Sequence, residues 1–207
     1  MLLLDLDGTI SDPGLGIENS FNHALRHFGY EPLTKDQVDA CIGPPLNESF
    51  AAITGSASPE HITELVAVYR DCYAATGYRE NTLYAGIPEA LAKLKNRNIQ
   101  LAVCTSKRRD FALSILQMFA LHHYFDFVSG GDVGIQKTQQ IKELLDSGRI
   151  NPDWIMVGDR HFDMHAAHAN GLKAAGVLWG YGSQKELALC RPEFLLNTPE
   201  ELTLLVQ

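Results

Sequence analysis

The sequence predicts an α/β fold, a three-layer Rossmann-like core on a parallel sheet with an inserted helical cap. Short apolar runs of strand length recur along the chain, at residues 2–6, 99–104, 125–128, 154–157, 174–178 and 194–196. Helical patterns alternate with these runs, at residues 88–97, 110–119, 137–147, 162–170, 184–190 and 199–206. Because a parallel sheet covered by helices on both faces needs strands that are apolar throughout, the alternation indicates that architecture.

A third observation is a long segment without strands, from residue 15 to about residue 82. It shows only helical periodicity, at residues 15–28, 35–40, 46–53 and 59–76. We therefore expect a catalytic core formed by residues 1–13 and 83–207 and a helical cap formed by residues 14–82. The joining segments, residues 11–14 and 79–86, contain the small and turn-forming residues that hinges often use.

The composition narrows the class of protein. The chain has 207 residues, 45% of them hydrophobic, which suffices for a buried core without disulfides. Its formal net charge of −8 argues against a nucleic-acid polymer or an anionic membrane as the main partner. The N-terminal apolar run is too short for a signal sequence, no segment is apolar for long enough to span a bilayer, and the cysteines are scattered. We expect a cytoplasmic protein of unassigned oligomeric state.

Two aspartates, Asp5 and Asp7, follow the first apolar run in the segment LLLDLDGTI. Alternate residues of an extended segment point the same way, so both carboxylates can face one site while Leu6 points into the core. Open α/β folds bind ligands at the carboxyl edge of the sheet, and a cation with a phosphate would offset the cost of burying two carboxylates there.

The chemistry that suits this pair is phosphate ester hydrolysis. We interpret Asp5 as a covalent nucleophile, because an aspartyl-phosphate divides a very slow reaction into two displacements. Asp7 would protonate the leaving group and later accept a proton from water, which requires a raised pKa. Gly8 permits close backbone approach, and Thr9 holds the turn by hydrogen bonding.

Thr105 and Lys137 are the candidates for holding the phosphoryl group. Thr105 follows the second core strand, where its hydroxyl can hydrogen-bond phosphoryl oxygens. Lys137 opens the helix after the third strand, where a cation can neutralise the phosphoryl group. Taken singly, a turn hydroxyl without a ligand and a surface lysine are the commoner interpretations. The alternative cation, Lys142, lies a turn further along the helix and is poorly placed for a site at the helix start.

Two more carboxylates, Asp159 and Asp163, follow the fourth strand. Hard oxygen ligands without paired thiolates suit Mg²⁺, which also bridges to substrate phosphate. We favour Asp159 as a direct ligand, and Asp163 as a residue that binds through water or orients its neighbours. The predicted metal site consists of Asp5, Asp7, Asp159 and Asp163.

The order of these motifs resembles the haloacid dehalogenase superfamily, in its phosphatase branch, across essentially the whole chain. The residues that carry the resemblance are Asp5-x-Asp7-Gly-Thr, Thr105, Lys137 and Gly158-Asp159 with Asp163. It implies Asp5 as nucleophile and Asp7 as acid/base. It also implies Thr105 and Lys137 as phosphate-holding residues, and Asp159 with the backbone carbonyl of Asp7 as Mg²⁺ ligands.

The resemblance also bears on the substrate. The position of the insert is similar to the C1-type cap of phosphoglycolate phosphatase and its relatives. The segments IGPPL at residues 42–46 and VLWGYG at residues 177–182 are similar to a subgroup that includes bacterial 5′-nucleotidases. The resemblance implies a Mg²⁺-dependent phosphatase for a small phosphorylated metabolite, phosphoglycolate-like or, alternatively, a nucleoside monophosphate.

Substrate choice is expected to come from the cap, which would close over the site. Its candidate contacts are Arg26, Lys35, Arg70, Arg79 and the Pro44-Pro45 loop with Asn47. Each is more often an exposed helix residue or a loop residue than a ligand contact.

Two rival interpretations come from other features. His161, His165 and His168 are spaced to share one helix face and could bind zinc, although solvent-facing or hydrogen-bonded histidines are commoner. A regulator that binds phosphate without turnover is the alternative of a different class. Asp7 argues against it, because a long-lived acyl phosphate is better served without a residue that activates water.

Overall fold

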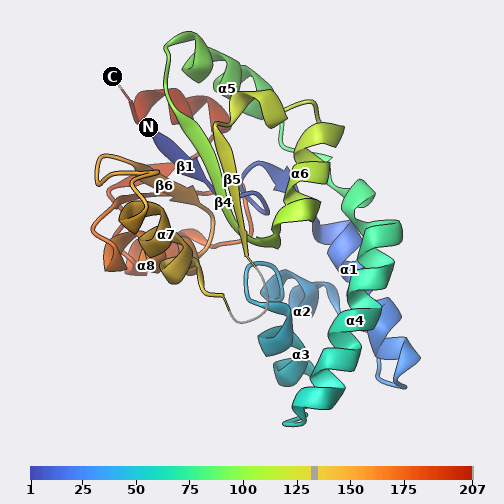
Figure 1. Ribbon diagram of the computed structural model, residues 1–207. Coiled ribbons are helices and arrows are strands. Elements are labelled where there is room, and N and C mark those ends of the chain that lie inside the picture. Colours follow the sequence, from blue (N-terminus) through green and yellow to red (C-terminus); the bar gives the residue numbers. More distant parts are fainter. Residues whose placement is uncertain (132–134, 207) are drawn as a thin grey trace. The chain divides into compact units, whose positions relative to one another are not determined.

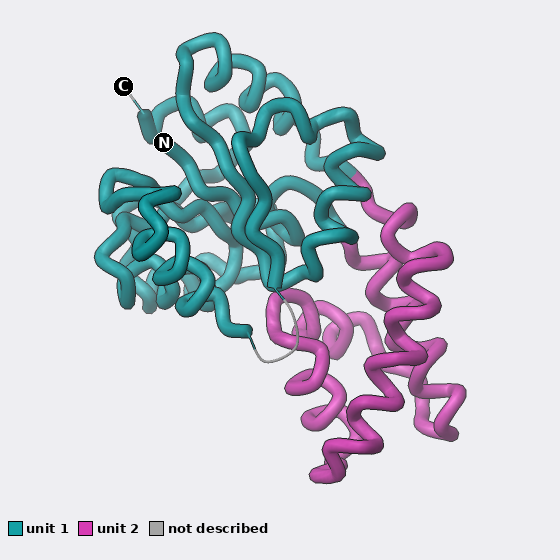
Figure 2. Tube along the Cα trace, viewed as in Figure 1, with its two compact units in different colours: residues 1–12, 83–207 teal, residues 13–82 magenta. Residues whose placement is uncertain are grey.

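The computed structural model describes residues 1–131 and 135–206. The chain divides into two compact units (Figure 2). Unit 1 consists of Met1–Asp12 with Leu83–Gln207, and unit 2 consists of Pro13–Thr82. Unit 1 is therefore discontinuous in sequence: the chain leaves it after Asp12 and returns to it at Leu83.

Unit 1 contains a six-stranded sheet in the order β5-β4-β1-β6-β7-β8 (Figure 1). Its strands pair in parallel throughout. They are β1 (Leu2–Leu4), β4 (Leu101–Arg108), β5 (Phe127–Gly131), β6 (Ile155–Gly158), β7 (Lys173–Val177) and β8 (Phe194–Leu196). The predicted α/β fold is confirmed, because parallel strands joined through helices form the core.

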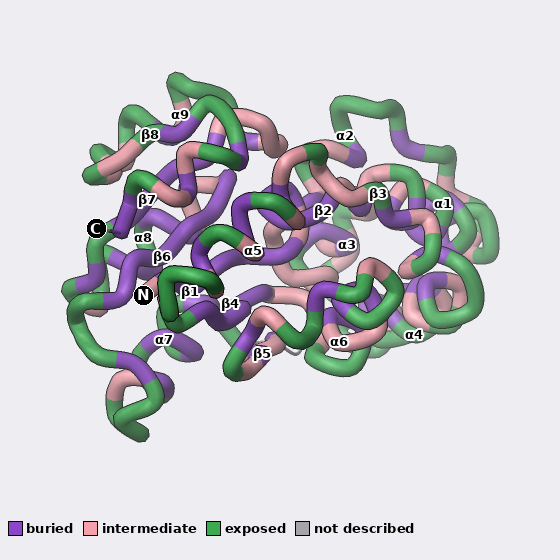
Figure 3. Tube along the Cα trace, turned by 90° about the horizontal axis from the view of Figure 1, so that it is seen from above, coloured by how far each residue is buried: buried purple, intermediate pink, exposed green. Residues whose placement is uncertain are grey.

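The central strands are apolar and buried, as covered parallel strands require. All three residues of β1 are fully buried, as are Met156 and Val157 of β6, and Figure 3 shows these two strands inside the unit. In register, Leu4 lies opposite Val103 on one side and Val157 on the other. The residues that follow these three positions therefore reach the same edge of the sheet.

Helices cover both faces of this sheet (Figure 1). On one face α7 (Lys137–Asp146) and α8 (His161–Ala169) pack on strand residues that include Leu3, Ala102 and Met156. The other face carries α5 (Ile87–Asn96) and α6 (Arg109–Met118), and α9 (Gln184–Leu189) lies near the start of α8. Among the residues that the structure describes, no helix has the length and apolar character that crossing a membrane requires.

The structure differs from the predicted elements in three places. Residues 199–206, predicted as helical, contain the 3₁₀ helix η3 (Pro199–Leu204), whose apolar spacing resembles that of an α-helix over so short a stretch. Strand β4 continues through the polar residues up to Arg108, where a turn was expected. Two short strands that the sequence analysis missed, β2 (Ser11–Asp12) and β3 (Thr82–Leu83), form a two-stranded sheet.

Unit 2 is helical, as its periodicity predicted. It contains α1 (Gly14–His27), α2 (Lys35–Ala40), α3 (Leu46–Thr54), α4 (Pro59–Ala75) and the 3₁₀ helix η1 (Gly77–Glu80). Its core is aromatic: the ring of Phe21 lies 4.8 Å, centroid to centroid, from those of Phe50 and Tyr69. Helix α4 begins with Pro59 after Ser58, whose hydroxyl accepts from the backbone N of His61.

Candidate active site

The carboxyl edge of the sheet collects polar side chains from three adjacent strands. Asp5 and Asp7 follow β1, Thr105 lies within β4 opposite Gly130 of β5, and Asp159 follows β6. The backbone N of Asp5 donates to the carbonyl of Val157 at 2.9 Å, which continues the β1–β6 pairing one residue further. Asp5 (5% exposed), Thr105 (1%) and Asp159 (0%) are all buried.

Lys137, the first residue of α7, joins two of the carboxylates. Its Nζ lies 2.8 Å from Asp5 Oδ2 and also donates to Asp163 Oδ1. The second oxygen of Asp5, Oδ1, accepts from the backbone N of Leu6 at 2.8 Å. One ammonium therefore contacts two buried carboxylates and fixes the positions of all three groups.

The charges at this end of the site are unevenly balanced. Burial opposes the charge of Lys137, but Asp163 and Asp5 raise its pKa overall. Burial raises the pKa of Asp163 to about 6, against the opposing effect of Lys137. Burial, with the charges of Asp163 and Asp5, raises the pKa of Asp159 well above its ordinary value. Three buried carboxylates thus exceed the positive charge available to them.

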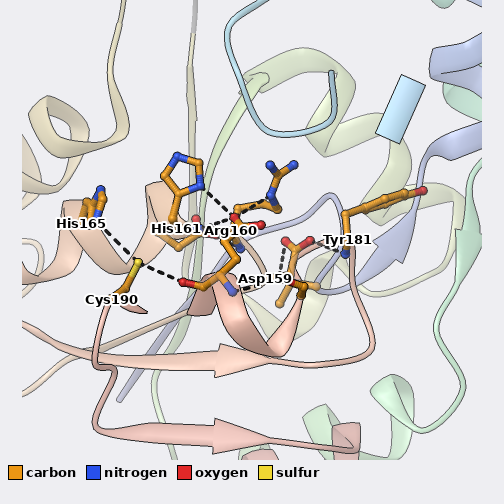
Figure 4. A network of polar contacts seen from close by, with 10 residues as sticks. Asp159, Arg160, His161, His165, Tyr181 and Cys190 are labelled. Atoms are coloured by element: carbon orange, nitrogen blue, oxygen red, sulfur yellow. Dashed lines mark hydrogen bonds and ion pairs between the residues drawn. The ribbon is translucent and has the colours of Figure 1, made fainter. Parts of the chain in front are cut away.

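Backbone donors orient the two carboxylates that follow β6. Tyr181 N donates to Asp159 Oδ2 at 2.8 Å (Figure 4), and the Thr9 hydroxyl donates to Asp159 Oδ1 at 3.4 Å. Arg160 N donates to Asp163 Oδ2 at 3.0 Å at the start of α8. Trp179 Nε1 donates to the carbonyl of Thr9, so the segment after β7 also holds the loop after β1.

Glycines pack closely against these carboxylates. A Cβ at Gly8 would lie 2.2 Å from Asp159 Oδ2, and one at Gly158 would lie 2.1 Å from Asp163 Cγ. A Cβ at Gly180 would lie 2.3 Å from the carbonyl oxygen of Gly8. Gly8 also has a φ of 79°, a conformation that favours glycine. The walls of the acidic cluster are therefore backbone rather than side chain.

Asp7 has surroundings of its own. Lys107 Nζ lies 2.9 Å from Asp7 Oδ2, and the two side chains are 7% and 14% exposed. Asp7 Oδ1 is buried and has no hydrogen-bond partner among the residues that the structure describes. Burial raises the pKa of Asp7, and Lys107 opposes that shift. Sequence reasoning missed Lys107; its position two residues after Thr105, as in a continuing strand, was the available signal.

The other residues considered for binding phosphate, Thr105 and Lys142, lie in different surroundings. The Thr105 hydroxyl accepts from the backbone N of Lys107 at 3.2 Å, so it stands at the same edge as Asp7. Lys142, the alternative to Lys137, is exposed and pairs with Asp146 at 2.6 Å. Only Lys137 of these two lysines reaches the acidic cluster.

The three histidines of α8 each have a separate partner. His161 Nδ1 lies 2.8 Å from Glu186 Oε1, and His165 Nε2 lies 3.5 Å from Cys190 Sγ (Figure 4). His168 Nε2 lies 3.3 Å from Glu193 Oε2. The three histidines therefore act as separate hydrogen-bonding residues and do not converge on a shared metal site.

Within residues 1–131 and 135–206, one group of three acidic, histidine or cysteine side chains brings its ligand atoms within 4.8 Å of one another. It consists of Asp5, Asp159 and Asp163. Oxygen-only ligands of this kind fit Mg²⁺. Burial and the mutual repulsion of the carboxylates raise the pKa values of Asp159 and Asp163, so a cation beside them would be stabilising. The donor set therefore fits the predicted metal.

Comparison with known proteins gives concordant results. The family model of haloacid dehalogenase-like hydrolases matches residues 2–177. A 5′-nucleotidase from Pseudomonas aeruginosa (strain PAO1) is 36% identical over 195 residues, 92% of this chain and 88% of that protein. The structure of a predicted phosphatase from Clostridium acetobutylicum matches with a TM-score of 0.91 and 35% identity, over 97% of this chain and 94% of that one.

A further relative is longer than this chain. The tyrosine-protein kinase PtkA from Mycobacterium tuberculosis (strain ATCC 25618 / H37Rv) is 34% identical over 186 residues, 88% of this chain. The match spans 63% of the length of that relative.

Proposed function

Because the chain belongs to the haloacid dehalogenase-like hydrolase family, we propose that it is a Mg²⁺-dependent phosphatase that hydrolyses a small phosphate monoester through an aspartyl-phosphate at Asp5. The observation that carries the proposal is the placement of two aspartates with two separate lysines at one edge of the sheet. Asp5 pairs with Lys137 and Asp7 pairs with Lys107. One carboxylate can then attack phosphorus while the other exchanges protons.

The first half of the reaction transfers the phosphoryl group to the protein. An oxygen of Asp5 attacks phosphorus, the bond to the ester oxygen breaks, and its electron pair stays on that oxygen. Asp7 gives the ester oxygen a proton, so that an alcohol leaves. Thr105 and Lys137 hold the phosphoryl oxygens, and Lys137 also contacts Asp5.

The second half returns Asp5 to its free state. Water attacks phosphorus of the aspartyl-phosphate and gives a proton to Asp7. The Asp5–phosphorus bond breaks, and inorganic phosphate leaves.

Mg²⁺ would be held by the carboxylates of Asp5 and Asp159, with the backbone carbonyl of Asp7 and with Asp163 close by. When bound, it supplies positive charge that neutralises the phosphate and offsets the mutual repulsion of the carboxylates. Asp163 orients Lys137 in this arrangement.

The substrate is proposed to be a small phosphorylated metabolite of the phosphoglycolate type, selected by unit 2 acting as a cap over a core formed by residues 1–13 and 83–207. The 36% identity to a 5′-nucleotidase favours nucleoside 5′-monophosphates as the second candidate.

The test is release of inorganic phosphate from a panel of esters with Mg²⁺, using Asp5→Asn as the control. The panel contains p-nitrophenyl phosphate, phosphoglycolate and the common nucleoside 5′-monophosphates. A kcat/KM at least about tenfold higher for one class identifies the substrate type. No turnover of any ester above the Asp5→Asn control would overturn the proposal and leave a non-catalytic regulator.

A further inference from the structure

Lys107 makes an ion pair with Asp7, but the proposed steps above give the lysine itself no role. Strand β4 runs past Thr105 to Arg108, and its register with β5 shifts between these two residues. At this irregular strand end the Nζ of Lys107 lies 2.9 Å from Asp7 Oδ2, with both side chains largely buried. A buried charge pair of this kind holds its partners in one geometry.

The two oxygens of Asp7 are therefore unlike. A lysine ammonium has donors only, so Oδ2 accepts from Lys107 and a proton on Oδ2 would face another hydrogen. Oδ1 is buried without a partner among the described residues. A buried oxygen left unpaired costs free energy, which points to a partner that arrives from outside the chain.

We infer that Lys107 is a positioning residue for Asp7: its ammonium occupies Oδ2 and thereby presents Oδ1 as the oxygen that exchanges the proton. The inference rests on the proposed function, since it specifies how Asp7 acts as acid and base. When Asp5 attacks phosphorus, the proton on Oδ1 moves to the ester oxygen as its bond to phosphorus breaks. When water attacks the aspartyl-phosphate, its proton goes to the same Oδ1.

The leaving group provides the first test. The kcat/KM of Lys107→Met is measured on p-nitrophenyl phosphate and on glycerol 2-phosphate, because it reports phosphoryl transfer to Asp5 and not the later hydrolysis common to both esters. The phenolate of the first ester leaves without a proton, whereas the alkoxide of the second needs one. We expect a loss of about 100-fold on the alkyl ester and less than about tenfold on the aryl ester. Equal losses on both esters would overturn the inference, because a lysine that only binds phosphate affects both alike.

A double-mutant cycle provides the second test. In an Asp7→Asn background, Lys107→Met is expected to change kcat on p-nitrophenyl phosphate by less than about twofold, because its partner is already gone. A further loss as large as in the wild-type background overturns the inference and assigns Lys107 to substrate binding. Lys107→Arg keeps the charge and the donors, and is expected to recover most of the activity on the alkyl ester.

Controls separate the failure of this inference from that of the proposed function. Lys142→Met removes an exposed lysine from α7 and is expected to leave both activities unchanged. If Asp7→Asn itself loses the same factor on both esters, the acid/base function of Asp7 fails. If Asp7→Asn discriminates between the esters and Lys107→Met does not, only the inference about Lys107 fails. Should Lys107→Met not fold, Lys107→Gln is measured in the same way, with the same two outcomes.

Discussion

Asp5 and Asp7 stand two residues apart in the chain, but the balance of charge around them differs. At the Asp5 end, three carboxylates lie within 4.8 Å of one another, and Lys137 is the lysine that contacts two of them. At the Asp7 end, one carboxylate pairs with Lys107, and one of its oxygens has no partner among the described residues. The first end has more negative than positive charge, and the second is balanced.

This difference assigns different chemistry to the two ends. A cluster with excess negative charge is stabilised by a divalent cation. A balanced pair with a spare oxygen has no such need and can exchange a proton instead. In the proposed mechanism, the carboxylate that would bind the metal and the carboxylate that transfers the proton are separated by a single residue, Leu6, whose side chain is buried.

The largest expected effect tests whether the Asp5 end contains the nucleophile. Asp5→Asn removes the attacking oxygen and is expected to lower kcat on every ester by at least about 10,000-fold. Phosphate release from p-nitrophenyl phosphate with Mg²⁺ measures it. Turnover above about one hundredth of the wild-type rate would show that the nucleophile lies elsewhere.

Removing Lys137 makes the imbalance at the Asp5 end worse. Lys137→Met leaves Asp5 and Asp163 without their ammonium and is expected to lower the free energy of unfolding by about 3–5 kcal/mol without Mg²⁺. Urea denaturation measures it, and added Mg²⁺ is expected to restore part of the loss. Lys142→Met on the same helix is the matched control, expected to change stability by less than about 0.5 kcal/mol. Equal stability of the two variants contradicts the shared role of Lys137.

Gly8 joins the two ends, and its substitution tests how closely they are packed. Gly8→Ala places a Cβ against Asp159 at a φ of 79°. We expect the free energy of unfolding to fall by about 2–4 kcal/mol, and Mg²⁺ binding measured by calorimetry to be weaker. Gly29→Ala is a matched control, because Gly29 has the same φ and an added Cβ would meet nothing within 4 Å. The free energy of unfolding of this control is expected to fall only by the cost of placing alanine in the left-handed conformation, about 1–2 kcal/mol, and its Mg²⁺ binding is expected to be unchanged. A Gly8→Ala variant with unchanged Mg²⁺ affinity would refute close packing at this point.

The smallest expected effect concerns Glu186, which holds the start of the helix that carries Asp163. Burial raises the pKa of Glu186, but hydrogen bonds from His161 and Arg160 lower it overall, to about 2. A lowered pKa stabilises the fold fully above the unfolded-state pKa near 4.3, and the contribution is lost as pH falls toward about 2. Because Glu186 is partly exposed, Glu186→Gln is expected to lower stability at neutral pH by less than about 1 kcal/mol.

Urea denaturation at several pH values checks this prediction. The deficit of Glu186→Gln relative to wild type should shrink as the pH falls from about 5 toward about 3. A deficit that is constant over this range would mean that the carboxylate charge does not contribute.

The fold was predictable where an element is long enough to show a period. The alternation of apolar strands and helices identified the parallel sheet, and strand ends located Asp5, Asp7, Thr105 and Asp159 at one edge. Strands β2 and β3 have two residues each and carry no period. The 3₁₀ geometry of η3 was missed because a short apolar spacing suits both helix types.

The partner of Asp7 was missed for a different reason. Lys107 stands beside Arg108 and Arg109, and nothing in the residue types separates the three. Their contacts diverge only in three dimensions: Lys107 meets Asp7, Arg108 meets Asp110, and Arg109 Nε donates to a carbonyl of β5. Strand β4 continues through polar residues, which strand propensity disfavours, and this extension places Lys107, rather than either arginine, beside Asp7.

The glycines around the carboxylates have a consequence for how this site can change by mutation. At positions 8, 158, 180 and 182 every substitution adds atoms, and the space that a first carbon would need is already taken by Asp159, Asp163 or neighbouring backbone. In a saturation mutagenesis experiment these positions should reject all residue types alike, small or large, polar or apolar. Tolerance at the carboxylates themselves would depend on chemistry, whereas tolerance at their glycine neighbours would depend on volume and, at Gly8, also on backbone conformation.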